Sequence, residues 1–112
     1  MAVSRGDSLE HPYTLVRRAG PTAYVSGVLP YGLDGEIVHD RDEAIERVLA
    51  VLAERLDAAG LSLDDVVKTT VYLTDLAWRD ALNVAFHRGF RPPRPARTAV
   101  EVRALPRGAA IE

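Results

Sequence analysis

The sequence of 112 residues contains no cysteine, and its sixteen acidic residues nearly balance its fourteen basic ones, which leaves a formal charge of −2. Without cysteine, the chain has no disulfide framework, no thiolate nucleophile and no cysteine-ligated metal. The small acidic surplus provides no general attraction to a nucleic acid. We therefore expect no nucleic-acid partner.

Long apolar runs are also missing. No segment reaches the roughly 18 apolar residues of a membrane-spanning helix, and the polar residues 1–10 do not resemble a signal peptide. The three histidines, His11, His39 and His87, lack the spacing of metal ligands. We expect a cytoplasmic protein with no membrane contact and no metal site.

The length fits a single domain, residues 1–112, in which residues 1–10 form a loose N-terminal segment. Residues 13–19 and 22–29 are short apolar segments on either side of a Gly-Pro turn, which predicts a hairpin of two strands. Gly27 would weaken the second strand unless another group packs closely against it.

Two helices are indicated further along the chain. Residues 40–59 carry apolar side chains at three- and four-residue spacing, with Asp40 as the N-cap and Gly60 just past the end. Residues 65–74 alternate as a strand does, and residues 76–90 form a second amphipathic segment. We predict an α+β domain with a mostly antiparallel sheet and two helices on one face. The other face keeps Val, Tyr and Leu side chains, which favours a symmetric homo-oligomer.

The last eighteen residues combine an arginine and a carboxylate. Thr98 to Arg103 alternate as a half-buried strand, and Pro106 and Gly108 provide a turn before the chain returns. An antiparallel return would bring Glu112 beside Arg97, as an anion anchor with a carboxylate next to it. Such a pair on a hairpin is usually a solvated ion pair worth about 0–1 kcal/mol.

A resemblance sharpens this interpretation. It is carried by His11-Pro12-Tyr13, Val25-Ser26-Gly27, Ala58–Leu61, Asp65–Asp75 (DVVKTTVYLTD), Asn83, Pro95–Val102 (PARTAVEV) and Leu105–Glu112. In this order and spacing the chain resembles the YjgF/RidA family of imine deaminases, also described as endoribonuclease L-PSP. The match runs from about Pro12 to the last residue.

The resemblance implies a chorismate-mutase-like fold that assembles as a homotrimer with clefts between neighbouring subunits. It implies hydrolysis of 2-imino acids to 2-keto acids and ammonia, without a metal or organic cofactor. Arg97 would hold the substrate carboxylate and Glu112 would activate water. Further positions in or near the cleft are Tyr13, Ser26, Gly27 and Asn83. Three of them also have a plainer structural interpretation: Tyr13 as a strand aromatic at an interface, Ser26 as a residue that satisfies a bulge beside Gly27, and Asn83 as a helix residue that bonds backbone or solvent.

Some features depart from the family pattern. Val28 stands where many members carry Gln, Ala99 stands where active deaminases often carry Cys, and the family's last strand continues beyond the Glu112 position. Other functions therefore stay open: a hydrolase for one pathway's imine or enamine, or a non-catalytic trimer that binds 2-keto acids or other small carboxylates. An endoribonuclease is disfavoured by the charge balance.

Overall fold

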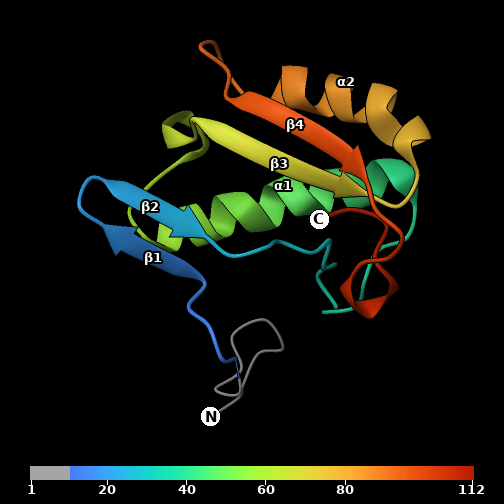
Figure 1. Cartoon of the computed structure of the whole chain (residues 1–112), viewed down its shortest axis with the longest axis horizontal. Coiled ribbons are helices and arrows are strands. Elements are labelled where there is room, and N and C mark those ends of the chain that lie inside the picture. Colours follow the sequence, from blue (N-terminus) through green and yellow to red (C-terminus); the bar gives the residue numbers. More distant parts are fainter. Residues whose placement is uncertain (1–10) are drawn as a thin grey trace.

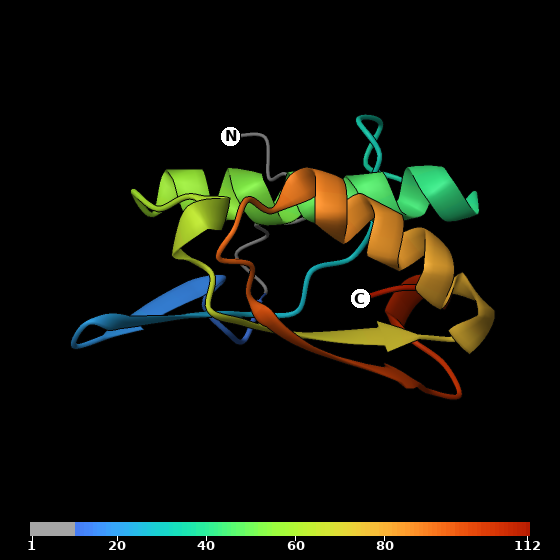
Figure 2. The same cartoon turned by 90° about the horizontal axis from the view of Figure 1, so that it is seen from above.

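The computed structural model describes residues 11–112, and the N-terminal segment expected to be loose lies outside them. Two helices lie on the same side of two small sheets (Figure 1; Figure 2). This arrangement confirms the predicted α+β class with both helices on one face. The elements are β1 (Val16–Ala19), β2 (Thr22–Val25), α1 (Arg41–Ala58), β3 (Lys68–Leu73), α2 (Arg79–Gly89) and β4 (Ala96–Glu101).

Helix α1 follows its sequence signals closely. The Asp40 carboxylate accepts a hydrogen bond from the Glu43 backbone N–H at 3.1 Å, so it satisfies one of the free donors of the first turn. Gly60, with φ of 79°, takes the left-handed conformation that ends a helix. Ile45 and Leu56 lie on its buried face.

Helix α2 packs against α1 and β3 to make the main core. A short 3₁₀ turn, Leu76–Trp78, precedes it, and the Asp75 carboxylate accepts a hydrogen bond from the Ala77 N–H at 2.9 Å. The buried residues of this core are Ala44, Ile45, Val71, Leu73, Leu82, Ala85, Phe86, Phe90 and Ile111.

The strand pairing confirms one predicted hairpin and corrects another. β1 and β2 form the expected antiparallel hairpin, but β3 and β4, the longest pair, are parallel. Strands joined through a helix run parallel because the helix returns the chain to the end where it started. The final segment pairs with β3 instead of β4: Tyr72 and Glu112 exchange two backbone hydrogen bonds of 2.9 Å. The predicted hairpin between Arg97 and Glu112 is therefore wrong, and β3 lies between them.

The outer face of the β3–β4 sheet has no helix over it (Figure 2). Lys68, Thr70 and Tyr72 of β3 point outward, while Val71 and Leu73 are buried beneath the helices. Tyr72 is 39% exposed. This face is partly apolar, as the sequence predicted. No helix within residues 11–112 is long and apolar enough to cross a membrane.

Candidate functional site

Arg97 is held on two sides by helix α2. It occupies the second position of β4, and its Nη2 donates a hydrogen bond to Asn83 Oδ1 at 2.6 Å. Its guanidinium carbon also lies 4.9 Å from the centre of the Phe86 ring. A cation over an aromatic face is attracted by the ring's negative quadrupole. The amide and the ring together fix the plane of the guanidinium before any ligand arrives.

No carboxylate within residues 11–112 forms an ion pair with Arg97. Partial burial lowers the pKa of Arg97, and the positive charge of Arg79 lowers it further. Arginine nevertheless stays protonated, because its ordinary pKa lies far above neutrality. Within residues 11–112, the ion pairs are Arg41–Asp42, Arg88–Glu46 and Arg91–Asp64. Arg97 is therefore a preorganised cation that is able to accept an anion.

Glu112 lies in a second, separate region. Its carboxylate packs against Gly27, where an added Cβ would lie 2.9 Å from the Glu112 carboxyl carbon and closer still to Oε2. The predicted strand over residues 22–29 ends at Val25, so Gly27 lies just past β2, and its close neighbour is the Glu112 side chain. Burial raises the pKa of Glu112, because a carboxylate loses hydration there. A carboxylate with a raised pKa is a stronger base for taking a proton from water.

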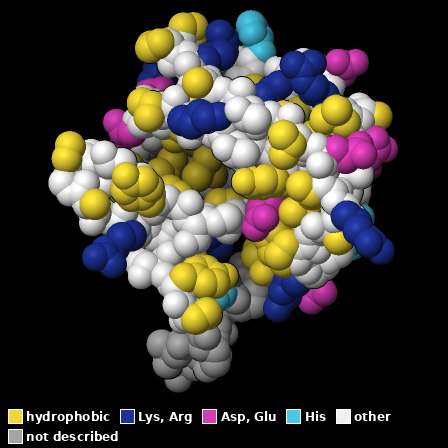
Figure 3. Space-filling view, viewed as in Figure 1, with side chains coloured by type: hydrophobic (Ala, Val, Ile, Leu, Met, Phe, Trp, Pro, Cys, Tyr) yellow, Lys and Arg dark blue, Asp and Glu magenta, His cyan; other side chains and the backbone are white. Residues whose placement is uncertain are grey.

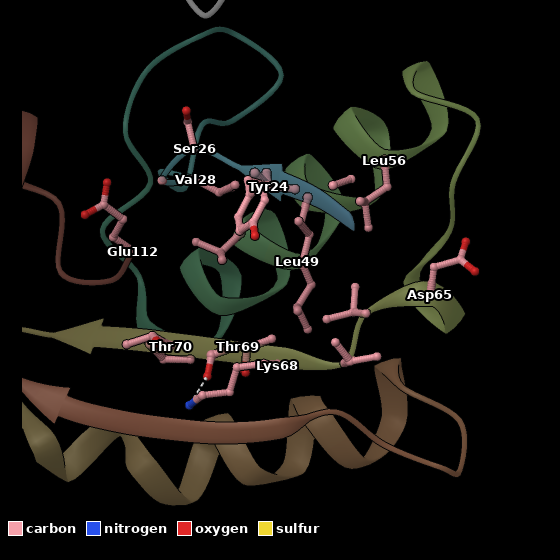
Figure 4. A pocket seen from close by; sticks show the side chains of 18 of the residues that line it. Tyr24, Ser26, Val28, Leu49, Leu56, Asp65, Lys68, Thr69, Thr70 and Glu112 are labelled. Carbon is pink, nitrogen blue, oxygen red and sulfur yellow. Dashed lines mark hydrogen bonds between the residues drawn. The ribbon is translucent and has the colours of Figure 1, made fainter. Parts of the chain in front are cut away.

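Ser26 borders the same corner. Its N–H donates to the Leu15 carbonyl at 2.9 Å and its hydroxyl donates to the Thr14 carbonyl at 2.6 Å. Figure 4 shows Ser26 and Glu112 at one end of a pocket. These two bonds hold the backbone that leads to Gly27, and a role for Ser26 in substrate binding remains a prediction.

The pocket itself is a groove of about 930 Å³ between β2 and β3. Its floor, visible as an apolar hollow in Figure 3, includes Leu49, Leu52 and Leu56 of α1. Because the backbone of Tyr72 faces Glu112, the backbone groups of Thr70, two residues earlier, face the same way into the groove. Strand edges over an apolar floor suit extended polypeptide better than a small polar acid. The polar corner at Glu112 is the candidate site.

Arg97 and Glu112 point to opposite faces of the sheet. Arg97 faces α2, whereas Glu112 is paired with Tyr72, whose side chain is on the outer face. Directly paired residues of antiparallel strands share a face. The structure thus brings Asn83 to Arg97, and Ser26 and Gly27 to Glu112. One copy of the chain does not unite the two groups.

Tyr13 joins neither group. Its side chain is 54% exposed, and its ring centre lies 4.8 Å from that of His11. It is not among the residues that line the groove. A role for Tyr13 in substrate binding therefore remains a prediction.

The prediction missed two residues beside Arg97. Phe86 lies under the guanidinium, and Arg79 contributes a positive charge to it. The signal was in the sequence, because Arg79, Asn83 and Phe86 have the i, i+4, i+7 spacing of one helix face. No group of three or more His, Asp or Glu within residues 11–112 is placed to hold a metal ion.

Comparison with known proteins agrees with the motifs. Residues 6–112 match the family model described as endoribonuclease L-PSP. A RutC family protein of Pyrococcus abyssi is 41% identical over 103 residues, which cover 90% of this chain and 81% of that protein. The 2-iminobutanoate/2-iminopropanoate deaminase of Mus musculus is 36% identical over 109 residues, covering 90% and 76%.

A solved structure shows the same fold. The crystal structure of RidA from an Antarctic Psychrobacter is 36% identical, with a TM-score of 0.86 over 93% of this chain and 85% of that one. The family match spans nearly the whole chain, and the relatives agree in sequence and in fold. The chain therefore belongs to the YjgF/RidA family, as its sequence motifs predicted.

Proposed function

We propose that this protein hydrolyses 2-imino acids to 2-keto acids and ammonia, at sites completed by neighbouring copies in a homotrimer. The observation that carries this proposal is the pair of separate groups. One is a preorganised guanidinium at Arg97 that has no ion-pair partner within residues 11–112, and the other is a carboxylate with a raised pKa at Glu112. The mouse relative named 2-iminobutanoate/2-iminopropanoate deaminase supports the choice of substrate.

The positions of the two groups explain why more than one copy is needed. Arg97 lies on β4, which is an edge strand, and Glu112 is on the outer face beside Tyr72. A contact between the edge of one copy and the face of the next is heterologous, and such contacts form a closed ring when the rotation between copies closes. A trimeric ring would bring Arg97 of one copy toward Glu112 of its neighbour. It would also cover Val100, which is 38% exposed.

The chemistry follows from the two groups. Two N–H donors of Arg97 bind the planar substrate carboxylate and orient the imine carbon. Glu112 takes a proton from water as the water oxygen bonds to that carbon, and passes the proton to the imine nitrogen. The resulting carbinolamine loses its hydroxyl proton through Glu112 to the amine. The C–N bond then breaks, ammonia leaves, and the C=O bond of the 2-keto acid forms.

The departures from the family pattern fit this scheme without a further polar group. Val28 is largely buried in the smaller core cluster and presents an apolar side chain to the groove that Glu112 also lines. Ala99 shares the α2-facing side of β4 with Arg97. Because the Ala99 methyl group has no polar atom, Arg97 and Asn83 bind the substrate carboxylate without it.

The test is hydrolysis of 2-iminobutanoate made in situ by an amino-acid oxidase. Wild type is expected to accelerate imine loss. Arg97→Ala should lower kcat/KM by about thirtyfold or more, since loss of a partner from a charged pair costs about 2–5 kcal/mol. Glu112→Gln should lower kcat with little change in KM, because it keeps the shape but loses the base. Arg88→Ala is the matched control, because Arg88 also lies on α2 but pairs with Glu46.

Three results would contradict the proposal. A wild-type protein that is assembled but does not accelerate imine loss is not a general deaminase. Saturable binding of 2-oxobutanoate without turnover would instead favour a carboxylate-binding trimer. RNA cleavage that survives Arg97→Ala would favour the endoribonuclease activity.

A further inference from the structure

A second guanidinium lies next to Arg97 on the same helix face. Asn83, which bonds to Arg97, and Phe86, which lies under it, both belong to α2. Arg79 precedes Asn83 by four residues, so the two are neighbours on one face. Helical side chains tilt toward the N-terminus, and the Asn83 amide therefore projects over the turn that contains Arg79. This geometry places Arg79 alongside the Arg97 half-site.

The electrostatics agree with this placement. The positive charge of Arg79 is the second cause, after burial, of the lowered pKa of Arg97. Arg79 is exposed, and within residues 11–112 it takes part in no ion pair. Two like charges held together without a counter-ion repel each other. An anion with two charged groups would relieve that repulsion.

The nearby carboxylates are already engaged or face elsewhere. Glu101 Oε1 accepts a hydrogen bond from the Leu76 N–H at 2.8 Å, and Asp75 Oδ1 accepts one from Ala77 at 2.9 Å. Asp80 is adjacent to Arg79 in sequence, and adjacent residues on a helix do not face each other. Among the described residues, no carboxylate forms an ion pair with either guanidinium group.

We propose that Arg79 is a specificity-determining residue that binds a second carboxylate, so that the preferred substrates are short 2-imino dicarboxylic acids. This inference rests on the proposed function. The carboxylate next to the imine carbon binds Arg97, and the carboxylate at the end of the side chain binds Arg79. A monocarboxylic imino acid uses Arg97 alone.

The test compares two imino acids across two variants. 2-Iminoglutarate and 2-iminobutanoate are made in situ by amino-acid oxidases, and kcat/KM is measured for wild type, Arg79→Gln and the control Arg88→Gln. Arg79→Gln should lower kcat/KM for the diacid by about tenfold or more and change the monoacid by less than about threefold. Arg88→Gln should change neither, because Arg88 pairs with Glu46 instead.

Equilibrium binding gives a readout that does not need turnover. Calorimetry with 2-oxoglutarate and 2-oxobutanoate should show tighter binding of the diacid by wild type, and Arg79→Gln should abolish that preference. Equal losses for both acids, or no preference in wild type, would overturn the role of Arg79 and leave the proposed hydrolysis intact. If no imine is hydrolysed, the proposed function fails, and the binding preference alone decides the role of Arg79.

Discussion

The two halves of the candidate site differ in how they hold their charge. The Arg97 half is polar and braced, with an amide at 2.6 Å and an aromatic ring at 4.9 Å. The Glu112 half is a polar corner of an apolar groove, where the carboxylate packs against a residue without a side chain. The Arg97 half fixes the orientation of the guanidinium, whereas the Glu112 half leaves open space around the carboxylate oxygens.

The same physical cause has opposite uses in these halves. Burial disfavours the charged form of both groups, so it lowers the pKa of Arg97 and raises that of Glu112. Arg97 starts so far above neutrality that it remains a cation and a permanent anchor. Glu112 starts below neutrality, so the same loss of hydration makes it a better base. Arg97 therefore keeps its charge, while Glu112 becomes more basic.

The largest effect is expected from mixing two inactive variants. Arg97→Ala and Glu112→Gln each disable every site in their own oligomer. If each site takes Arg97 from one copy and Glu112 from the next, random mixed trimers carry both residues at about a quarter of their interfaces. Co-refolding the two variants should therefore restore about a quarter of the wild-type rate, measured by imine hydrolysis.

The control for this experiment is the double variant mixed with wild type at the same ratio. If each site is shared between two copies, this mixture also leaves about a quarter of the sites intact. If each copy holds a whole site, it leaves about half of them intact. If the mixed single variants stay inactive, the shared site is contradicted. Arg97 and Glu112 would then act within one copy or belong to no common site.

A substitution at Gly27 tests the catalytic role of Glu112 separately from the stability of the fold. In Gly27→Ala the added methyl group would overlap the Glu112 carboxylate, the far end of a flexible side chain. The carboxylate should move while the backbone stays. We expect kcat to fall by about tenfold to a hundredfold, because a displacement of about 1 Å costs that much, with KM and melting temperature little changed. Gly89→Ala, whose added Cβ would meet only Leu49 at 3.4 Å, is the control.

An unchanged kcat in Gly27→Ala would count against Glu112 as the base. A loss of folding, detected by circular dichroism, would show instead that Gly27 is needed for the chain path after β2. The two outcomes are distinguishable because the Gly89 control reports the general effect of adding a methyl group.

The sequence predicted the ends of α1 well, because helix-end signals are local, whereas the strands predicted over residues 13–19 and 22–29 are shorter in the structure, at Val16–Ala19 and Thr22–Val25. Asp40 and Gly60 bound α1 as expected, and Asp75 caps the turn before α2. Gly27 was predicted to lie inside a strand, whereas it follows the end of β2 and contacts the Glu112 side chain. Helix caps and terminal glycines act within a few residues of the chain, so they can be predicted from the sequence before the fold is known.

The relation between Arg97 and Glu112 was not predictable in the same way. The alternation of residues 96–101 identifies a strand, but it does not identify the strand's partner. A turn with Arg107 at φ of 60° takes the chain across the sheet, so that Glu112 pairs with Tyr72 of β3. Pairing depends on contacts far apart in sequence, whereas the helix-face spacing of Arg79, Asn83 and Phe86 was available and overlooked.

A smaller effect is expected from the brace on Arg97. Asn83→Ala removes the hydrogen bond to Nη2 but keeps the Phe86 ring below the guanidinium. A hydrogen bond to a charged group contributes about 1.5–3 kcal/mol at most, and the freed guanidinium regains contact with water. We expect KM to rise by about fivefold to tenfold while kcat falls less. A large loss of kcat with constant KM would mean that Asn83 acts on the reacting atoms.

The smallest effect concerns stability and tests the Glu112 half alone. Because burial raises the pKa of Glu112, the folded state binds its proton more tightly than the unfolded state does. The stability from this group is present below the unfolded pKa of about 4.3 and is lost as pH rises through the raised folded pKa. Glu112→Gln should therefore raise the melting temperature at about pH 8, on the order of 2 °C, and change it little near pH 4. Glu54→Gln, an exposed carboxylate on α1, is the control. If Glu112→Gln raises the melting temperature equally at both pH values, the gain comes from packing and not from removal of the ionised carboxylate. The contrast between Glu112 and the permanently charged Arg97 would then be wrong.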